Sequence, residues 1–196
     1  MKKPYFGRLL TAMVTPFDES GVNVEAVKKL VDWWLAHGTD GLVVTGSTGE
    51  AATMSVEEKK LLWTTVVQYV NGRVPVIAGT GSNSTAGSIE MTKLAESCGV
   101  DGVLIVGPYY NKPTQEGYYR HFKAIADSTS CKVILYNVPG RTAANVAPAT
   151  VARTAAACPN VVAIKEAAGR VDQVAELYRL LPEDFTIYSG DDGLIL

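Results

Sequence analysis

The feature that most constrains the fold of this chain is a strict alternation of two hydrophobic periods. Short, β-rich apolar runs recur at intervals of roughly 30 residues, the length of one strand–helix–strand unit. Most of these runs are continuously apolar, which is typical of parallel strands covered on both faces. They predict strands at Leu9–Thr15, Gly41–Thr45, Val74–Gly79, Gly102–Val106, Val133–Asn137, Val161–Lys165 and Phe185–Ser189.

Helical patterns separate the predicted strands. An apolar stripe over residues 27–35 predicts a first helix, with Asn23 as its N-cap and Gly38 at its end. The segment Ser55-Val56-Glu57-Glu58 has the pattern of a capping box and predicts a second helix that runs to about Val70. Further helices are predicted over Thr85–Cys98, Gln115–Asp127, Ala147–Ala157 and Asp172–Leu181.

This order of elements predicts an α/β fold, either an open doubly wound sheet or a (β/α)8 TIM barrel. No linker or change of composition interrupts the alternation, so we favour the barrel and assign residues 1–196 to a single domain. A barrel has eight strands and typically about 250 residues. Because the seventh predicted strand ends near Ser189, we expect a barrel that is truncated after this strand and lacks the eighth.

The composition excludes several classes of function. With 18 basic and 20 acidic residues the net charge is −2, which argues against a nucleic-acid-binding surface. No apolar run approaches the roughly 18 residues of a membrane helix, so we expect no membrane partner. Cys98, Cys131 and Cys158 form no CxxC pair, and we interpret them as buried or half-buried thiols of a cytoplasmic protein. His37 and His121 are far apart and are assigned to surface or packing positions.

Chemically reactive residues gather after six of the predicted strands. In a barrel the carboxyl ends of the strands form one face, where active sites are built from several loops. The clustering therefore predicts one active-site rim formed by 46–50, 79–83, 107–111, 136–142, 165–166 and 189–192.

Lys165 is the sharpest candidate on this rim. It ends the apolar run 161–164, where loss of hydration lowers the pKa of an amine and supplies some of its free form. A free amine can attack a ketone and form a Schiff base. The alternative is a lysine that is solvated at the strand end or paired with Glu166, and the barrel context favours the nucleophile.

Hydroxyl groups near Lys165 in the predicted rim suggest proton transfer. Tyr136 and Tyr110 can pass protons in a closed site, although each is also a common packing residue. Ser47 and Thr48 lie in a glycine-flanked turn that we expect to enter a helix, where backbone N–H groups bind anions. The alternative for this pair is a turn followed by an ordinary helix cap.

Arg141 follows Pro139-Gly140 in a segment that we expect to be neither regular helix nor strand. A guanidinium there suits a substrate carboxylate, with a surface ion pair as the alternative. Gly79-Thr80-Gly81 is not a complete dinucleotide-binding motif, and Asp191-Asp192 lacks further metal ligands. We therefore expect neither a cofactor nor a metal.

The segments GSTGE, GPYYN, YNVPGRT, AIKEA and SGDD occur in this order and together resemble the 4-hydroxy-tetrahydrodipicolinate (dihydrodipicolinate) synthase family. This family belongs to the pyruvate-dependent class I aldolases, which include N-acetylneuraminate lyase. The resemblance runs from Phe6 to Asp192, and its arginine-bearing YNVPGRT segment is the most specific part. It implies a Schiff-base lyase that condenses pyruvate with L-aspartate 4-semialdehyde in diaminopimelate and lysine biosynthesis.

The resemblance also implies roles for individual residues. Lys165 would carry the Schiff base, and Tyr136 would move protons in a relay with Ser47 and Tyr110. The tyrosine at position 110 would reach the site of a neighbouring subunit, which implies a homo-oligomer, commonly a homotetramer built as a dimer of dimers.

The same resemblance assigns three residues to substrate binding. Thr48 would hold the carboxylate of pyruvate, Arg141 that of the semialdehyde, and Gly190 of the SGDD segment would also contact substrate. The family usually has threonine where Ser47 stands. Serine keeps the hydroxyl but loses the β-branch that restricts χ1, so we expect a relay that is intact but less preorganised.

Two further departures from the family carry predictions. Feedback-inhibited members bind lysine near positions where this chain has Val56, Lys59 and Gly87, and the charge of Lys59 should repel that ligand. We therefore predict weak or no inhibition by lysine, although Asn83 and Tyr109 remain suitable for it. The family's eighth strand and small C-terminal helical domain also lie beyond this sequence.

Two alternatives to the synthase stay open at this point. One is a sister pyruvate-dependent aldolase acting on a sugar acid. The other is a catalytically inactive barrel fragment that serves only as a binding module.

Overall fold

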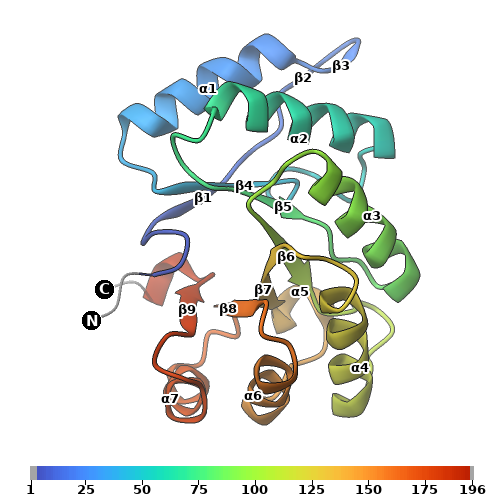
Figure 1. Cartoon of the computed structure of the whole chain (residues 1–196), viewed down its shortest axis with the longest axis vertical. Coiled ribbons are helices and arrows are strands. Elements are labelled where there is room, and N and C mark those ends of the chain that lie inside the picture. The colour runs from blue at the N-terminus through green and yellow to red at the C-terminus, as the bar shows by residue number, and fades with distance from the viewer. Residues whose placement is uncertain (1–3, 195–196) are drawn as a thin grey trace.

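The computed structural model describes residues 4–194, and its central feature is one curved, fully parallel sheet of seven strands (Figure 1). The strands lie side by side in chain order, with β1 and β9 as the edges of the described sheet. They are β1 (Leu10–Ala12), β4 (Gly41–Val44), β5 (Val76–Gly79), β6 (Gly102–Val106), β7 (Lys132–Asn137), β8 (Val161–Glu166) and β9 (Thr186–Ser189). The predicted α/β barrel topology is therefore confirmed, and each of the seven predicted strands is present.

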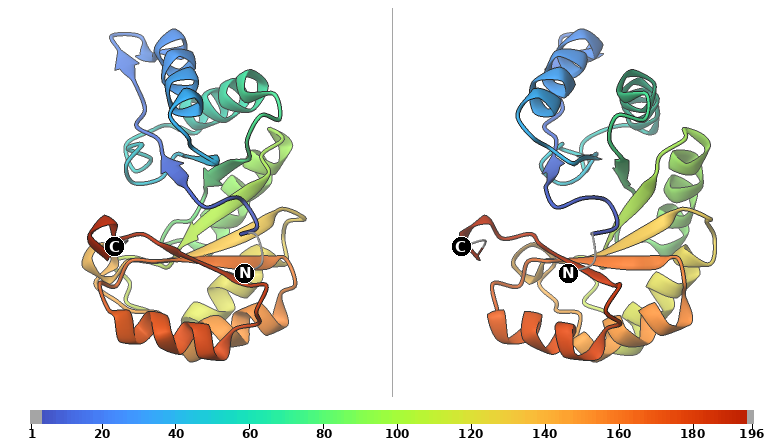
Figure 2. Two further views of the ribbon diagram at one scale, coloured as in Figure 1. Left: turned by 90° about the vertical axis from the view of Figure 1, so that its left-hand side faces the viewer. Right: turned by 60° about the vertical axis from the view of Figure 1, so that its left-hand side comes forward.

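Helices connect successive strands and cover the outer side of the curved sheet (Figure 2). They are α1 (Val24–Ala36), α2 (Val56–Val70), α3 (Thr85–Ser97), α4 (Gln115–Ala126), α5 (Pro139–Thr142), α6 (Pro148–Ala157) and α7 (Val171–Leu180), with a 3-10 turn η1 at Asp192–Leu194. The six predicted helices correspond to α1, α2, α3, α4, α6 and α7, and their ends agree to within a few residues.

The predicted caps explain where the first two helices begin. Oδ1 of Asn23 accepts a hydrogen bond of 2.9 Å from the backbone N–H of Ala26. Ser55 and Glu58 form the reciprocal capping box at the start of α2. Gly38 has a φ of +90° and follows the last turn of α1, as predicted for its end.

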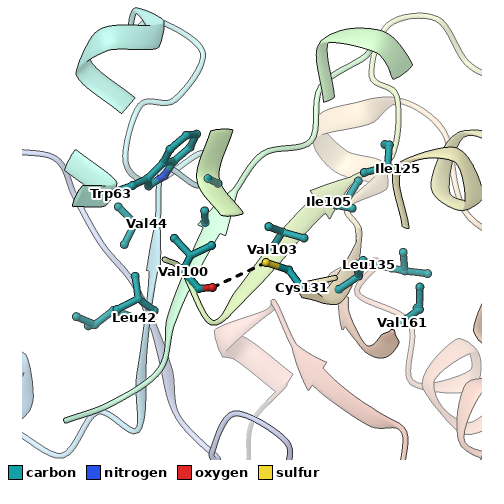
Figure 3. Close-up of a cluster of buried hydrophobic side chains, with 14 of the residues drawn as sticks. Leu42, Val44, Trp63, Val100, Val103, Ile105, Ile125, Cys131, Leu135 and Val161 are labelled. Atoms are coloured by element: carbon teal, nitrogen blue, oxygen red, sulfur yellow. Dashed lines mark hydrogen bonds between the residues drawn. The ribbon is translucent and has the colours of Figure 1, made fainter. Parts of the chain in front are cut away.

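Alternation along each strand divides the core into two layers. Outward-facing side chains such as Leu42, Val44 and Val103 pack against the helices together with Trp63, and Figure 3 shows part of this cluster. In the same cluster Sγ of Cys131 lies 3.8 Å from the carbonyl oxygen of Val100. Inward-facing residues form a second cluster in the lumen, made of Phe6, Val43, Ile77, Leu104, Ile134, Tyr136, Val138 and Ala163.

The N-terminal segment closes the lumen at the amino ends of the strands. Phe6 is buried, and its ring lies so close to Gly102 that a Cβ there would come within 2.6 Å of it. Its backbone N–H donates to the hydroxyl of Tyr188 on β9 (3.2 Å), and that hydroxyl donates to the carbonyl of Gly7 (3.1 Å). Residues 6 and 7 therefore contact β9 and precede β1, and they span the gap between the two edge strands.

Two small elements differ from the sequence-based expectations. A hairpin of β2 (Phe17–Asp18) and β3 (Gly21–Val22) precedes α1 and was not predicted, because two-residue strands show no period. The segment around Arg141, expected to be irregular, is the one-turn helix α5. Pro139 stands in its first turn, where the fixed φ of proline suits a helix and its missing N–H has no role.

The cysteines and His121 are buried or half-buried and His37 lies at the surface, in agreement with the prediction. Cys131 and Cys158 are buried free thiols and Cys98 is half-buried. His121 is buried in α4, and His37 stacks on Trp33 at a ring separation of 4.1 Å. No helix within residues 4–194 is long and apolar enough to cross a membrane.

Candidate active site

Lys165 and Tyr136 form the centre of the candidate site. They are direct partners in the register of β8 and β7, and both side chains point into the lumen near the carboxyl ends of the strands. The Nζ atom of Lys165 lies 4.6 Å from the centroid of the Tyr136 ring. The strand pairing itself therefore places an amine beside a phenol.

The surroundings of Lys165 favour the uncharged amine. Burial among apolar strand residues lowers the pKa of its ammonium from the ordinary value of 10.5. The carboxylate of Asp192 opposes this effect, and the positive charge of Arg141 adds to it. Since only the free amine is a nucleophile, this environment activates Lys165 for attack on a carbonyl.

Tyr136 is a buried phenol with polar contacts at its hydroxyl. It is 8% exposed, and burial raises the pKa of its phenol above the ordinary value of 10. The charge of Arg141 and a side-chain hydrogen bond with Ser47 act in the opposite direction. The structure thus brings the hydroxyls of Tyr136 and Ser47 together, and a hydroxyl pair of this kind can transfer a proton.

The turn that carries Ser47 is supported from behind by Thr45. This residue has a φ of +55°, which is rare for a β-branched side chain and marks backbone strain. Its Oγ1 accepts a 2.8 Å hydrogen bond from Nε1 of the buried Trp63 and lies 2.6 Å from the carbonyl oxygen of Val44. Sequence analysis did not single out Thr45, because its strain and its contact with α2 are tertiary.

Ser47 and Thr48 lie in a series of turns and not at a helix start. Glu50 N–H donates to the carbonyl of Ser47 (3.2 Å), and α2 begins only at Val56. The expected direct entry into a helix is therefore wrong, because residues 49–53 form consecutive hydrogen-bonded turns before α2 begins. Thr48 is exposed and does not line the cavity described below.

Arg141 reaches the site from α5. Its guanidinium lies close enough to affect both Lys165 and Tyr136, and no ion pair within residues 4–194 involves it. The surface ion pair weighed for this residue is thus not formed. An unpaired guanidinium beside the amine and the phenol is suited to an anionic group of a ligand.

Glycines give the site its space. A Cβ on Gly190 would lie 2.8 Å from Cε of Lys165, so only glycine leaves the lysine side chain room. A Cβ on Gly79 would lie 2.3 Å from the carbonyl oxygen of Thr45. The Gly79-Thr80-Gly81 segment, which resembled a broken dinucleotide motif, therefore serves close packing of the strand ends.

A cavity of about 270 Å³ opens beside Tyr136. Its only cationic wall residues are Lys59 and Arg141, and none of its wall residues in the described chain is acidic. Burial lowers the pKa of the Lys59 ammonium. The remaining lining is made of Thr45, Gly46, Ser47, Ala51, Ala52, Gly79, Thr80, Gly81, Ser82, Met91, Leu104, Val106, Tyr109, Tyr136, Val138 and Thr142.

Tyr110 stands apart from the other candidate residues within this chain. It is 89% exposed, has a φ of +68° and makes no side-chain hydrogen bond to residues 4–194. Nor do these residues bring together three or more side chains able to hold a metal ion. The structure thus assembles Lys165, Tyr136, Ser47, Arg141 and Gly190, and leaves Thr48 and Tyr110 at its surface.

Comparison with known proteins identifies one family. Residues 5–196 match the model of the dihydrodipicolinate synthetase family. The chain is 58% identical to the 4-hydroxy-tetrahydrodipicolinate synthases of Bacillus subtilis and of Desulforamulus reducens. Each match covers 97% of this chain, which spans 66% and 65% of the length of these two relatives.

Solved structures agree with this fold. A dihydrodipicolinate synthase of Bacillus anthracis superposes with a TM-score of 0.95 at 52% identity, over 97% of this chain and 65% of that one. A lysine-bound enzyme from Cyanidioschyzon merolae gives a TM-score of 0.95 at 44% identity, over 98% and 66% of the two chains. The chain therefore belongs to the dihydrodipicolinate synthetase family.

Proposed function

We propose that this chain carries the site of a 4-hydroxy-tetrahydrodipicolinate synthase, a Schiff-base lyase that condenses pyruvate with L-aspartate 4-semialdehyde. The observation that carries the proposal is the desolvated amine of Lys165 beside the buried phenol of Tyr136. The names of the relatives support the same reaction for a site of this kind.

The first half of the reaction captures pyruvate. The amine of Lys165 adds to the keto carbon, and a proton moves from nitrogen to the former carbonyl oxygen. A second proton, donated by Tyr136, then lets water leave and gives an iminium. Loss of a proton from the methyl group then yields an enamine. In this proposal Tyr136 and Ser47 receive and return these protons, since the ring of Tyr136 lies beside the amine and its hydroxyl bonds to Ser47.

The second half forms the ring. The enamine carbon attacks the aldehyde carbon of the semialdehyde, and the aldehyde oxygen gains a proton. The amino group of the same substrate then attacks the iminium carbon and displaces the amine of Lys165, which releases the heterocycle and regenerates the free enzyme.

The remaining candidates bind substrate in this proposal. Arg141 holds the carboxylate of the semialdehyde, Thr48 holds that of pyruvate, and Gly190 leaves the space in which the lysine adduct forms. Tyr110, exposed on this chain, completes the relay of a second copy, which makes a dimer the smallest active unit and a dimer of dimers the full assembly. The free thiols fit a reducing, cytoplasmic compartment.

Borohydride trapping tests the proposal directly. The chain is incubated with pyruvate, reduced, digested and examined by mass spectrometry. A pyruvyl adduct on the Lys165 peptide is expected, and Lys165→Ala should abolish it. An unmodified peptide would overturn every Schiff-base mechanism and favour the inactive binding module.

Turnover then decides between the two enzymes. With an adduct in hand, the chain is assayed with aspartate semialdehyde and with sugar-derived aldehydes. Arg141→Ala should reduce condensation with the semialdehyde far more than trapping of pyruvate. Turnover of sugar aldehydes alone would favour the sister aldolase.

A further inference from the structure

A buried carboxylate with no cationic partner lies directly behind the candidate site. Glu166 follows Lys165 on β8, points to the opposite side of the sheet and is 4% exposed. Within residues 4–194 no ion pair involves it. Its partners are all N–H donors: Nδ2 of Asn137 lies 3.0 Å from each oxygen, Nε2 of Gln173 3.0 Å from Oε2, and the backbone nitrogen of Ala168 2.7 Å from Oε1.

These donors come from the segments that carry the site. Asn137 follows Tyr136 on β7, and its Oδ1 accepts a 3.0 Å hydrogen bond from the backbone N–H of Val146, beyond α5. Its Nδ2 also contacts Oδ1 of Asn145 at 2.8 Å. Gln173 belongs to α7, and its Oε1 accepts a 2.9 Å hydrogen bond from Nδ2 of Asn145. One polar cluster therefore joins β7, β8, α7 and the segment that follows Arg141.

Backbone bonds continue the connection to the rim. Ala167 N–H donates to the carbonyl of Asn137 (2.9 Å), and Gly190 N–H donates to the carbonyl of Glu166 (2.8 Å). Residues 137 and 166 are also direct register partners. The cluster thus fixes the last residues of both strands, each one position beyond Tyr136 or Lys165.

A buried carboxylate that has N–H donors but no cationic partner stabilises the pairing of two strands poorly. Moving a charge out of water costs free energy, and apolar side chains of similar volume often stabilise a core better. Hydrogen bonds of fixed direction, however, specify a register and a rotamer where apolar contacts do not. This contrast indicates that the ends of β7 and β8 must be held in fixed positions.

We propose that Glu166 is a positioning residue, which through Asn137 and Gln173 aligns Lys165, Tyr136 and Arg141 for pyruvate capture. The inference rests on the proposed Schiff-base function and adds a residue to it that does not touch substrate. Glu166 acts through hydrogen-bond geometry: the groups whose charges act on the Lys165 amine are Asp192 and Arg141.

The test compares the rate of adduct formation in four versions of the 196-residue chain. Glu166→Gln keeps the size but turns one acceptor into a donor facing Gln173. Glu166→Gln combined with Gln173→Glu restores a donor–acceptor pair. Asn160→Ala is the matched control, since Asn160 donates to three carbonyls, including that of Cys131, at the amino end of the same strands.

A ten- to hundred-fold slower trapping of pyruvate is expected for Glu166→Gln, about the loss that a misplacement of one ångström causes. The pH at which trapping is half-maximal should stay unchanged, and the double variant should recover most of the rate. Asn160→Ala should lower the melting temperature and leave the rate per folded molecule as it is. Equal rates for Glu166→Gln and the parent chain would overturn the inference.

A second variant covers the case in which Glu166→Gln does not fold, and a second readout covers the case in which the parent chain forms no adduct. Should Glu166→Gln not fold, Gln173→Leu keeps the carboxylate but removes the amide that bonds Glu166 and Asn145, and it should still slow trapping more than Asn160→Ala does. Crystal structures of parent and variant compare the 4.6 Å separation of Lys165 Nζ and the Tyr136 ring, and an unchanged site contradicts positioning. Because this comparison needs no reaction, it remains decisive if the parent chain forms no adduct and the proposed function fails.

Discussion

The indole Nε1 of Trp63 donates a hydrogen bond of 2.8 Å to Oγ1 of Thr45, a residue in a strained backbone conformation. The bond crosses from α2 to the end of β4, and Ser47 lies two residues further along. A helix on the outer side of the sheet therefore influences a hydroxyl on its rim.

Trp63→Phe should loosen this turn. Loss of the donor leaves a buried hydroxyl less well bonded, and we expect a decrease of about 1–3 kcal/mol in the free energy of unfolding. Pyruvate trapping should slow as well, because Ser47 loses its support. Urea denaturation and trapping measure the two effects. Trp33→Phe, at an exposed position, is the control and should change neither by much.

Tyr136→Phe tests the proton transfer. Removal of the phenol hydroxyl should slow trapping by about 10²–10⁴-fold, the usual contribution of a general acid–base. Tyr118→Phe is the matched control, because its buried hydroxyl has no hydrogen-bond partner within residues 4–194. That variant should leave trapping unchanged and keep or raise stability. Similar losses in both variants would show that burial of a phenol, and not its position, matters.

Gly190→Ala should obstruct Lys165. The new methyl would lie 2.8 Å from Cε of the lysine and 2.9 Å from Cβ of Ala167, so the amine must shift. We expect slower trapping at all pyruvate concentrations. Gly87→Ala in α3, where the added Cβ meets only ordinary contacts of 3.5 Å or more, should trap at the parent rate and be slightly more stable. A rate equal to that of the parent chain would show that Lys165 does not need the space left by Gly190.

His121 should make stability depend on pH. Burial lowers the pKa of its imidazole from 6.5 to about 4, and within residues 4–194 it contacts Thr85 Oγ1 (2.9 Å) and the Phe122 ring. Between these two values the unfolded chain binds the proton more readily, so stability is lost as pH falls from 6.5 towards 4. The loss should reach at most about 3 kcal/mol.

Urea denaturation at pH 7 and pH 4.5 measures this effect. The same pair of measurements on His121→Gln cancels the contribution of the carboxylates, which titrate in both proteins. The difference between parent and variant should shrink in the acid sample. A constant difference would mean that His121 keeps its ordinary pKa.

Lysine should inhibit this chain weakly or not at all. The ammonium of Lys59 lines the cavity near Tyr109, and no acidic side chain of the described residues lines it with them. A cationic ligand would therefore meet repulsion. Turnover assayed with millimolar lysine is expected to stay close to its uninhibited value, and a steep loss of activity would contradict the prediction.

The sequence predicted the elements that depend on local pattern. Continuous apolar runs gave β4 to β9, and capping residues located the start of α1 and α2. Lys165 and Tyr136 could be placed on one rim because parallel strands end on the same side of the sheet. Their direct pairing depends on the register of β7 and β8, which no periodicity specifies.

What could not be predicted depends on contacts between distant residues. Thr45 and Trp63 are an ordinary threonine and tryptophan until a hydrogen bond joins them. Glu166 was considered only as a partner for Lys165, whereas alternation along β8 turns it to the other side of the sheet. The short helix α5 was missed because proline and glycine suggest irregular chain, although both are acceptable in a first turn.

The contact of the N-terminal segment with β9 has a consequence for the order of folding. Phe6 and Tyr188 are separated by 182 positions, so their hydrogen bond closes a loop that contains nearly the whole chain. Such a contact costs the most chain entropy and forms late, whereas each strand–helix–strand unit can form as soon as it is synthesised. The strand–helix–strand units can therefore form before the bond between Phe6 and Tyr188 joins the two edge strands.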